Sequence, residues 1–385
     1  MAVRLHEWFC LKPGRDNFKP HNVADAELIF CHDHLVNEQI VGSLERRFAG
    51  NEPVKMLIYG DWGVGKTHTI NHICKWLEHH KEEYPAYPVF IDIGDITKTT
   101  RFDALVRPFL DKLGVDFIIK LVHSYITKCP GVVKGLEQAS VASHVASAFG
   151  KLLLAPPGDT PPPVVALAMD YLRGRKLSAQ AGAMGFSQQL VDSKDFYDVL
   201  LAIGEMYRVV NDHRIIYIAD EAAKLEAVDN DDATRAHWVN ANKLIFDDNN
   251  RTFGFLYTVS GRRRDLPAAL FEPQLQNRLG ENAFEMPNLQ TNDVNEFLER
   301  LRTAFVDETQ ANALAQDGKI GEQPYSWDHY PFTADGHAGF VDYFSRTQEN
   351  AKPRDISGKL NDAGFIAAKL GRRLIDRECL EKAQM

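Results

Sequence analysis

The sequence predicts an α/β fold built on a parallel β-sheet. Short apolar runs at 54–59, 88–93, 214–219 and 252–259 have the length and composition of buried strands. Between the first two runs, residues 66–83 repeat apolar side chains at helical spacing, so this stretch is a strand, a loop, a helix and a second strand. Such β-α-β units form parallel sheets with helices on both faces.

The composition is that of an ordinary globular protein, with 44% hydrophobic and 25% charged residues. A formal net charge of −9 gives no global attraction to nucleic acid, so any DNA contact must come from a local basic patch. No apolar run of about 18 residues and no signal-peptide pattern occurs. We therefore expect a cytoplasmic protein with no membrane span. Its five scattered cysteines favour free thiols.

A phosphate-binding loop is predicted directly after the first strand. Its eight residues match the pattern G-x-x-x-x-G-K-[ST] and are Gly60, Asp61, Trp62, Gly63, Val64, Gly65, Lys66 and Thr67. Glycines allow the backbone to approach phosphates closely, and the helix N-terminus favours their negative charge. Lys66 should bridge the β- and γ-phosphates of ATP, and the Thr67 hydroxyl should bind Mg²⁺. We add His68 to the nucleotide-binding positions. The alternative is a glycine-rich turn that happens to precede a helix.

Two carboxylates end the third strand-like run. Asp220 and Glu221 would lie at the carboxyl edge of the sheet, where ligands bind in parallel α/β folds. Asp220 can hold Mg²⁺, and Glu221 can polarise the attacking water. An intact Glu221 favours ATP hydrolysis over simple nucleotide binding.

With these motifs in place, the chain resembles AAA+ ATPases, especially the origin-initiator and transposition-regulator branch. The resemblance implies that Ser260, or alternatively Thr258, is the polar residue near the γ-phosphate. It also implies that Arg278, in the segment 271–279, is an arginine finger and that Arg354, in the segment 352–356, is the second sensor. A guanidinium suits both roles because it stays charged and meets phosphate oxygens in a planar fork. A surface salt bridge for Arg278 and a helix cap for Arg354 are the alternatives.

A narrower resemblance involves residues 168–177, 184–186 and 195–203. These segments are similar to the ATP-binding components of bacterial phage-exclusion (BREX-type) systems. This resemblance implies a role in phage defence or mobile-element control.

Three parts of the chain are expected. Residues 1–50 form a lead-in that includes an adenine-side segment, and residues 51–287 form the ATPase core. A helical lid follows over 288–385. Lys66 and Asp220 are too far apart in sequence for short connections, so a helical insertion is predicted over about 101–210.

Metal and DNA sites of other kinds receive less support. His68 and His72 share a helix face without a further ligand set, so a polar helix face is favoured over zinc. The run from Cys31 to His34 is interpreted as a polar loop. DNA contact is possible at three basic segments, which are 173–176, 262–264 and 369–373.

The sequence leaves three functions open. The first is an ATP-switched assembly factor that acts with a DNA-associated partner. The second is a signalling ATPase that oligomerises on sensing a ligand and activates an effector, and the third is a slow nucleotide-binding scaffold. A finger acting between subunits implies a homo-oligomer that forms a ring or a filament.

Overall fold

The computed structural model describes residues 4–21, 24–156, 162–175, 182, 185–186, 189–247, 249, 251–320, 324–347 and 351–385. The chain divides into two compact units. We call the first the helical unit, which comprises Met1–Glu38, Asp61–His72 and Met286–Met385. The second is the sheet unit, which comprises Gln39–Gly60 and Ile73–Glu285. Residues 1–38 therefore pack with the C-terminal helices.

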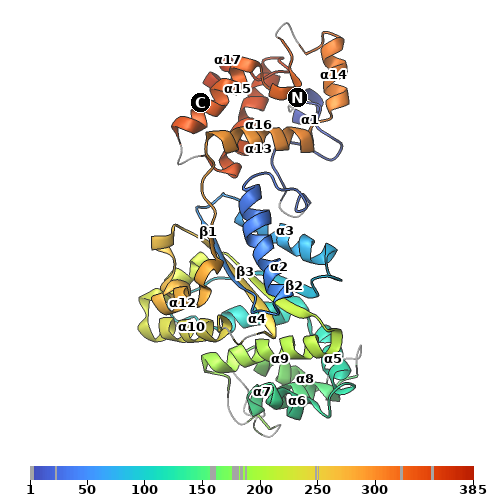
Figure 1. Cartoon of the computed structure of the whole chain (residues 1–385), viewed down its shortest axis with the longest axis vertical. Helices are drawn as coiled ribbons and strands as arrows, with labels where there is room; N and C mark the ends of the chain where they lie inside the picture. The colour runs from blue at the N-terminus through green and yellow to red at the C-terminus, as the bar shows by residue number, and fades with distance from the viewer. Residues whose placement is uncertain are drawn as a thin grey trace. The chain divides into compact units, whose positions relative to one another are not determined.

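The sheet unit contains one five-stranded parallel sheet (Figure 1). Its strands are β1 (Lys55–Gly60), β2 (Ala86–Asp92), β3 (Arg214–Asp220), β4 (Phe253–Ser260) and β5 (Ala283–Glu285), in the order β2-β3-β4-β1-β5. The predicted α/β fold with a parallel sheet is confirmed. The sequence prediction missed β5, because a three-residue strand carries too little periodicity to be recognised.

Both faces of the sheet are buried. Alternate residues of a strand point to opposite faces. Leu57 and Tyr59 of β1 belong to the large core shared with the insertion helices. Met56 and Ile58 point the other way and are equally buried. Neither face of the sheet is therefore open to solvent, as is usual for parallel sheets.

The predicted insertion is helical and connects β2 to β3 along the chain (Figure 1). Its helices are α4 (Asp103–Leu113), α5 (Val115–Ile126), α6 (Val132–Gln138), α7 (Ser143–Lys151), α8 (Pro163–Leu172) and α9 (Ser193–Asn211). The last of them packs on β3, where the Tyr217 hydroxyl donates to the carbonyl of Leu200 at 3.1 Å. The insertion thereby supports the strand that ends in Asp220.

Further helices follow the third and fourth strands. The segment after β3 forms a 3₁₀ helix, η4 (Ala222–Asn230), and then α10 (Asp232–Ile245). After β4 come α11 (Ala268–Phe271) and α12 (Pro273–Leu279). The segment before β1 forms a π-helix over His34–Val41 that continues as α2 (Gly42–Ala49).

The helical unit has its own hydrophobic core. Its helices are α1 (Leu5–Trp8), α13 (Thr291–Phe305), α14 (Glu308–Gln316), α15 (Ala334–Arg346), α16 (Pro353–Lys369) and α17 (Arg377–Lys382). The unit also holds the first half of α3 (Lys66–His79), which follows the phosphate loop. Within the described part of the chain, no helix has the length and apolar character that a bilayer crossing requires.

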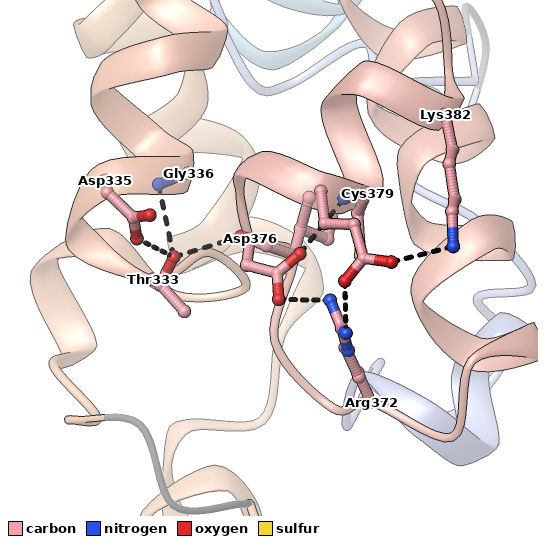
Figure 2. Close-up of polar contacts among 9 residues, drawn as sticks. Thr333, Asp335, Gly336, Arg372, Asp376, Cys379 and Lys382 are labelled. Atoms are coloured by element: carbon pink, nitrogen blue, oxygen red, sulfur yellow. Dashed lines mark hydrogen bonds and ion pairs between the residues drawn. The ribbon is translucent and has the colours of Figure 1, made fainter.

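A polar network joins the starts of α15 and α17 in this unit (Figure 2). Thr333 accepts a hydrogen bond from the Gly336 N–H at 3.1 Å and so caps α15. Asp376 accepts one from the Cys379 N–H at 3.0 Å and caps α17. Arg372 donates to both Asp376 and Glu378. The backbone N–H groups that begin these helices are therefore paired.

Candidate nucleotide-binding site

The phosphate loop has the backbone that its glycines predict. Gly63 has a φ of 91° and Gly65 a φ of 107°, a region that residues with a Cβ rarely adopt. The loop leaves β1 at Gly60 and enters α3 at Lys66. Such a turn directs successive N–H groups inward and forms an anion-binding nest.

Lys66 is buried within this loop. Its ammonium group donates to the main-chain carbonyl of Asp61 at 2.9 Å. A buried charge of this kind is costly unless it meets an anion or other strong acceptors. The ammonium group and the inward N–H groups together fit a phosphate chain.

The start of α16 contacts the same loop. The Lys352 ammonium lies 3.6 Å from the Asp61 carboxylate. The backbone N–H of Arg354 donates to the carbonyl of Gly63 at 3.4 Å. The Arg354 guanidinium lies 3.5 Å from the centre of the Trp62 ring. The structure thus brings the predicted second-sensor residue to the phosphate loop.

His68 and His72 hold the N-terminal segment against α3. His68 Nε2 is 2.7 Å from the carbonyl of Leu28, and His72 Nδ1 is 2.9 Å from the carbonyl of Ala26. Burial lowers the pKa of both imidazoles, although these carbonyl contacts act in the opposite direction. The polar helix face that the sequence predicts therefore packs against the N-terminal segment. The two acceptor carbonyls lie 40 and 46 residues away in sequence, so no local pattern predicts these contacts.

Asp220 is buried at the end of β3 in the sheet unit. The Thr258 hydroxyl on neighbouring β4 donates to its carboxylate, and the Glu221 N–H donates to the same oxygen at 2.8 Å. Glu221 has a left-handed backbone with a φ of 60°. Its carboxylate is half-exposed and lies 2.5 Å from the Lys224 ammonium. Asp220 is therefore fixed, whereas Glu221 faces solvent.

Asp92 is a third carboxylate at this edge, and sequence reasoning missed it. It ends β2 directly opposite Asp220 in the strand register. Burial raises its pKa, and the charges of Asp220 and Glu221 raise it further. The available signal was an aspartate that ends the strand beside the acidic pair. The negative potential at this edge favours a cation.

The residues fit magnesium better than a metal held by protein alone. Among the described residues, no cluster of three or more His, Cys, Asp or Glu side chains could hold a metal ion. Mg²⁺ usually takes one or two protein ligands and completes its shell with water and phosphate oxygens. A buried carboxylate with one fixed oxygen, as in Asp220, suits that chemistry. The run from Cys31 to His34 offers no such cluster.

The two candidates for the first sensor occupy different places on β4. Thr258 is buried and contacts Asp220 as described. Ser260 ends the strand and lies opposite Gly60 in the register, beside the first residue of the phosphate loop. Of the two candidates, Thr258 is the one whose hydroxyl donates to Asp220.

Arg278 is held by its own unit at the end of α12. Its guanidinium donates to the carbonyl of Lys243 at 3.0 Å and to the Asp247 carboxylate at 2.9 Å. Both members of the ion pair are a little over one-third exposed. Within the described chain, Arg278 meets none of the other predicted site residues. Its role as a finger stays a prediction.

Most of the basic segments are neutralised within the chain. Arg173 pairs with Asp111, Arg175 with Asp170, and Arg372 with Asp376 and Glu378. Lys176 lies outside the described residues. The segment Arg262–Arg264 is exposed directly after β4, with Arg264 3.6 Å from the Asp265 carboxylate, and we retain it as a candidate for an anionic partner because of its exposure.

The loop, the buried lysine and the acidic strand end define a P-loop nucleotide-binding protein. A model of the KAP family P-loop domain matches residues 36–253, which is more than half of the chain. The chain therefore belongs to the KAP family of P-loop NTPases. The match includes the phosphate loop and the Asp220–Glu221 pair and ends at Phe253, the first residue of β4. A search of curated proteins finds no match.

Solved structures of a Cdc6 protein and an ORC2 protein share the fold. Cdc6p from Pyrobaculum aerophilum is 13% identical, with a TM-score of 0.50 and coverage of 95% of this chain and 69% of that one. The Aeropyrum pernix ORC2 protein, solved as ADPNP-ADP complexes, is 14% identical, with a TM-score of 0.50 and coverage of 97% and 72%. The chain covers 65% of Aeropyrum pernix Orc1, solved in complex with DNA, at 13% identity and a TM-score of 0.47.

At these identities the likeness shows the fold alone. It confirms the predicted AAA+-like α/β class. Part of the segments that carry the resemblance to phage-exclusion components, including residues 176–177 and 184, lies outside the described residues. The resemblance to BREX-type components stays a prediction.

Proposed function

We propose that this chain binds ATP with Mg²⁺ at its phosphate loop and hydrolyses it. The conformation of the loop carries the proposal. Gly63 and Gly65 have the positive φ angles that an anion-binding nest uses, and the buried Lys66 ammonium donates to the Asp61 carbonyl of the same loop. A phosphate chain would meet both the N–H groups of the loop and the Lys66 ammonium.

Each polar residue then has a separate task. The loop amides and Lys66 bind the phosphates, and the Thr67 hydroxyl and the Asp220 carboxylate hold Mg²⁺. Bound Mg²⁺ supplies charge neutralisation to the phosphates. Glu221 orients the attacking water and accepts its proton, which requires the carboxylate to leave Lys224, 2.5 Å away.

We further propose that the nucleotide state switches assembly or partner binding. Arg278 is partly exposed at the end of α12, so a neighbouring subunit could receive its guanidinium once the Asp247 pair opens. Head-to-tail contacts of this kind close into a ring or extend as a filament. The exposed Arg262–Arg264 segment supports DNA as the first partner to test, and a phage-defence or mobile-element setting is the corresponding hypothesis.

Two variants test the proposal. Lys66→Ala should abolish ATP binding in calorimetry, because it removes the ammonium from the loop. Glu221→Gln should retain ATP binding, lose most turnover and accumulate a larger species in light scattering with Mg-ATP. Lys224→Met is the matched control, since it removes the partner of Glu221 and leaves the carboxylate in place.

The outcomes separate the functions left open by the sequence. Unchanged ATP affinity of Lys66→Ala would overturn the nucleotide site. Turnover stimulated by duplex DNA would support the DNA-associated function. An assembly that responds to a foreign protein or metabolite and ignores DNA would support the signalling function instead. Equal turnover by wild type and Glu221→Gln would indicate a scaffold.

A further inference from the structure

Trp62 is an unusual exposed residue in the phosphate loop. Trp62 is 65% exposed, the largest exposed fraction among the large hydrophobic residues of the described chain. The Arg354 guanidinium carbon lies 3.5 Å from the centre of its ring. At that distance the cation stacks on the ring face and is attracted by the ring quadrupole.

The backbone around this stack is held closely. The Arg354 N–H donates to the Gly63 carbonyl at 3.4 Å. A Cβ built on Gly63 would lie 3.3 Å from the Arg354 Cβ, which is tighter than ordinary van der Waals contact. The first turn of α16 is therefore seated directly on the loop, which places the exposed side chain of Arg354 beside Trp62.

Stacking leaves the hydrogen-bonding capacity of the guanidinium unused. The N–H groups of arginine lie in the plane of the group, whereas the stack uses only its face. Among the described residues, no side chain or carbonyl accepts a hydrogen bond from the Arg354 guanidinium. Arg278 differs, because it already donates to a carbonyl and to a carboxylate.

We propose that Trp62 is a positioning residue that presents the Arg354 guanidinium to the terminal phosphate of ATP. This inference rests on the proposed function of the loop. Trp62 orders a long side chain before the ligand arrives, so binding does not have to order it. The planar fork can then bind two phosphate oxygens while one face stays on the indole. ADP lacks the phosphate that would use this fork.

The proposal predicts that Trp62 contributes to the preference for a triphosphate over a diphosphate. A purely structural role, in which the indole only docks α16 on the loop, would change both affinities equally. The pair Lys352–Asp61 provides the comparison, because it also joins α16 to the loop and offers no stacking surface.

The test is calorimetry of ADP and of a non-hydrolysable ATP analogue on the full chain. Trp62→Leu should weaken analogue binding by about tenfold and change ADP binding by less than about twofold. Trp62→Phe should recover most of the loss, because phenylalanine keeps an aromatic face. Lys352→Met should leave the ratio of the two affinities as in the wild type.

A double-mutant cycle supplies the decisive arm. Once Arg354→Leu has removed the guanidinium, adding Trp62→Leu should cost no further analogue affinity. Additive losses, or equal losses for ADP and the analogue, would overturn the positioning role. If wild type binds both nucleotides and Trp62→Leu binds them with the same affinities, this inference alone is overturned. A wild type that binds neither would overturn the proposed function and this inference together.

Discussion

The hydroxyl of Thr258 donates a hydrogen bond to the carboxylate of Asp220 across neighbouring strands β4 and β3. The Glu221 N–H donates to the same oxygen at 2.8 Å. Thr258 and Asp220 both lie in strands and their side chains are both buried, so the plane of the Asp220 carboxylate is set before any ligand binds. An outer partner of this kind orients a metal ligand and tunes its affinity.

Thr258→Val should therefore reduce Mg²⁺-dependent turnover by about 10- to 100-fold, the usual range for loss of an outer-shell partner. The variant keeps the shape of the side chain and removes only the hydroxyl. Steady-state turnover as a function of Mg²⁺ concentration is the measurement. Thr258→Ser retains the hydroxyl and should remain close to wild type.

Ser260→Ala distinguishes the two candidates for the first sensor. Because Thr258 contacts Asp220 and Ser260 does not, we expect the larger loss from Thr258→Val. A larger loss from Ser260→Ala would instead assign the sensor role to the end of β4, opposite Gly60.

Arg278→Gln should leave ATP affinity unchanged and lower turnover at protein concentrations that allow assembly. The half-exposed pair with Asp247 contributes less than about 1 kcal/mol to the free energy of unfolding, so folding should survive the change. Turnover and calorimetry over a range of protein concentrations are the measurements.

Asp247→Asn is the matched control for Arg278, because it breaks the same ion pair and keeps the guanidinium. It should not lose turnover. Mixing Arg278→Gln with Glu221→Gln should restore part of the activity if the finger acts between subunits, since one partner supplies the arginine and the other the glutamate. Mixtures as inactive as their components would contradict a finger in trans.

Local sequence patterns were sufficient to predict most of the fold. Strands β1 to β4 were predicted within two residues of their observed ends, because buried parallel strands are continuous apolar runs. The phosphate loop was predicted because its chemistry needs glycines and a lysine at fixed spacing. Asp220 followed from its place after an apolar strand, since strand ends meet at one edge of a parallel sheet.

The remaining site depends on contacts between distant parts of the chain. Nothing in the sequence around Trp62 indicates that Arg354 stacks on it. Asp92 could be recognised as part of the site only from the strand register, which places it opposite Asp220. The same holds for His72, whose acceptor belongs to Ala26. Packing of the whole chain sets these neighbours, and no periodicity in a single segment encodes them.

Acidification should release the N-terminal segment from α3. Burial lowers the pKa of His68 and His72, so the folded state binds protons more weakly than the unfolded state does. The stabilisation is complete above the ordinary pKa of 6.5 and is lost as the pH falls below it. Hydrogen exchange of residues 24–31 at pH 7.5 and about pH 5.5, corrected for the intrinsic amide exchange rate at each pH, should show lower protection factors at the lower pH.

Substitutions that replace each imidazole by an amide keep one N–H donor but cannot take up a proton. They therefore distinguish the effect of protonating His68 and His72 from the loss of their hydrogen bonds. His72 donates from Nδ1 to the Ala26 carbonyl, a position that an asparagine amide can reproduce. His68 donates from Nε2 to the Leu28 carbonyl, which a glutamine can reproduce. The double variant His68→Gln, His72→Asn should flatten the pH response, whereas His79→Gln, at an exposed position, should not. A response that survives the double variant would assign it to other groups.

Gly336→Ala should destabilise the helical unit even though alanine is the better helix former. Gly336 lies in the first turn of α15, and a Cβ there would be 2.2 Å from the carbonyl oxygen of Ile375. That overlap requires the network around Thr333 and Asp376 to move (Figure 2). We expect a loss of about 2–3 kcal/mol in the free energy of unfolding, measured with urea.

Gly358→Ala is the matched change in an open position. Gly358 lies within α16, and a Cβ there would meet nothing within 4 Å. Alanine should therefore raise the free energy of unfolding by about 0.5–1 kcal/mol through its helix propensity and the smaller entropy of its unfolded chain. Because both residues are helical glycines, opposite signs for the two variants would attribute the Gly336 loss to the Ile375 carbonyl. A Gly336→Ala variant as stable as wild type would mean that the connection between α15 and α17 shifts at little cost, so the approach of the Ile375 carbonyl would not limit the stability of the unit.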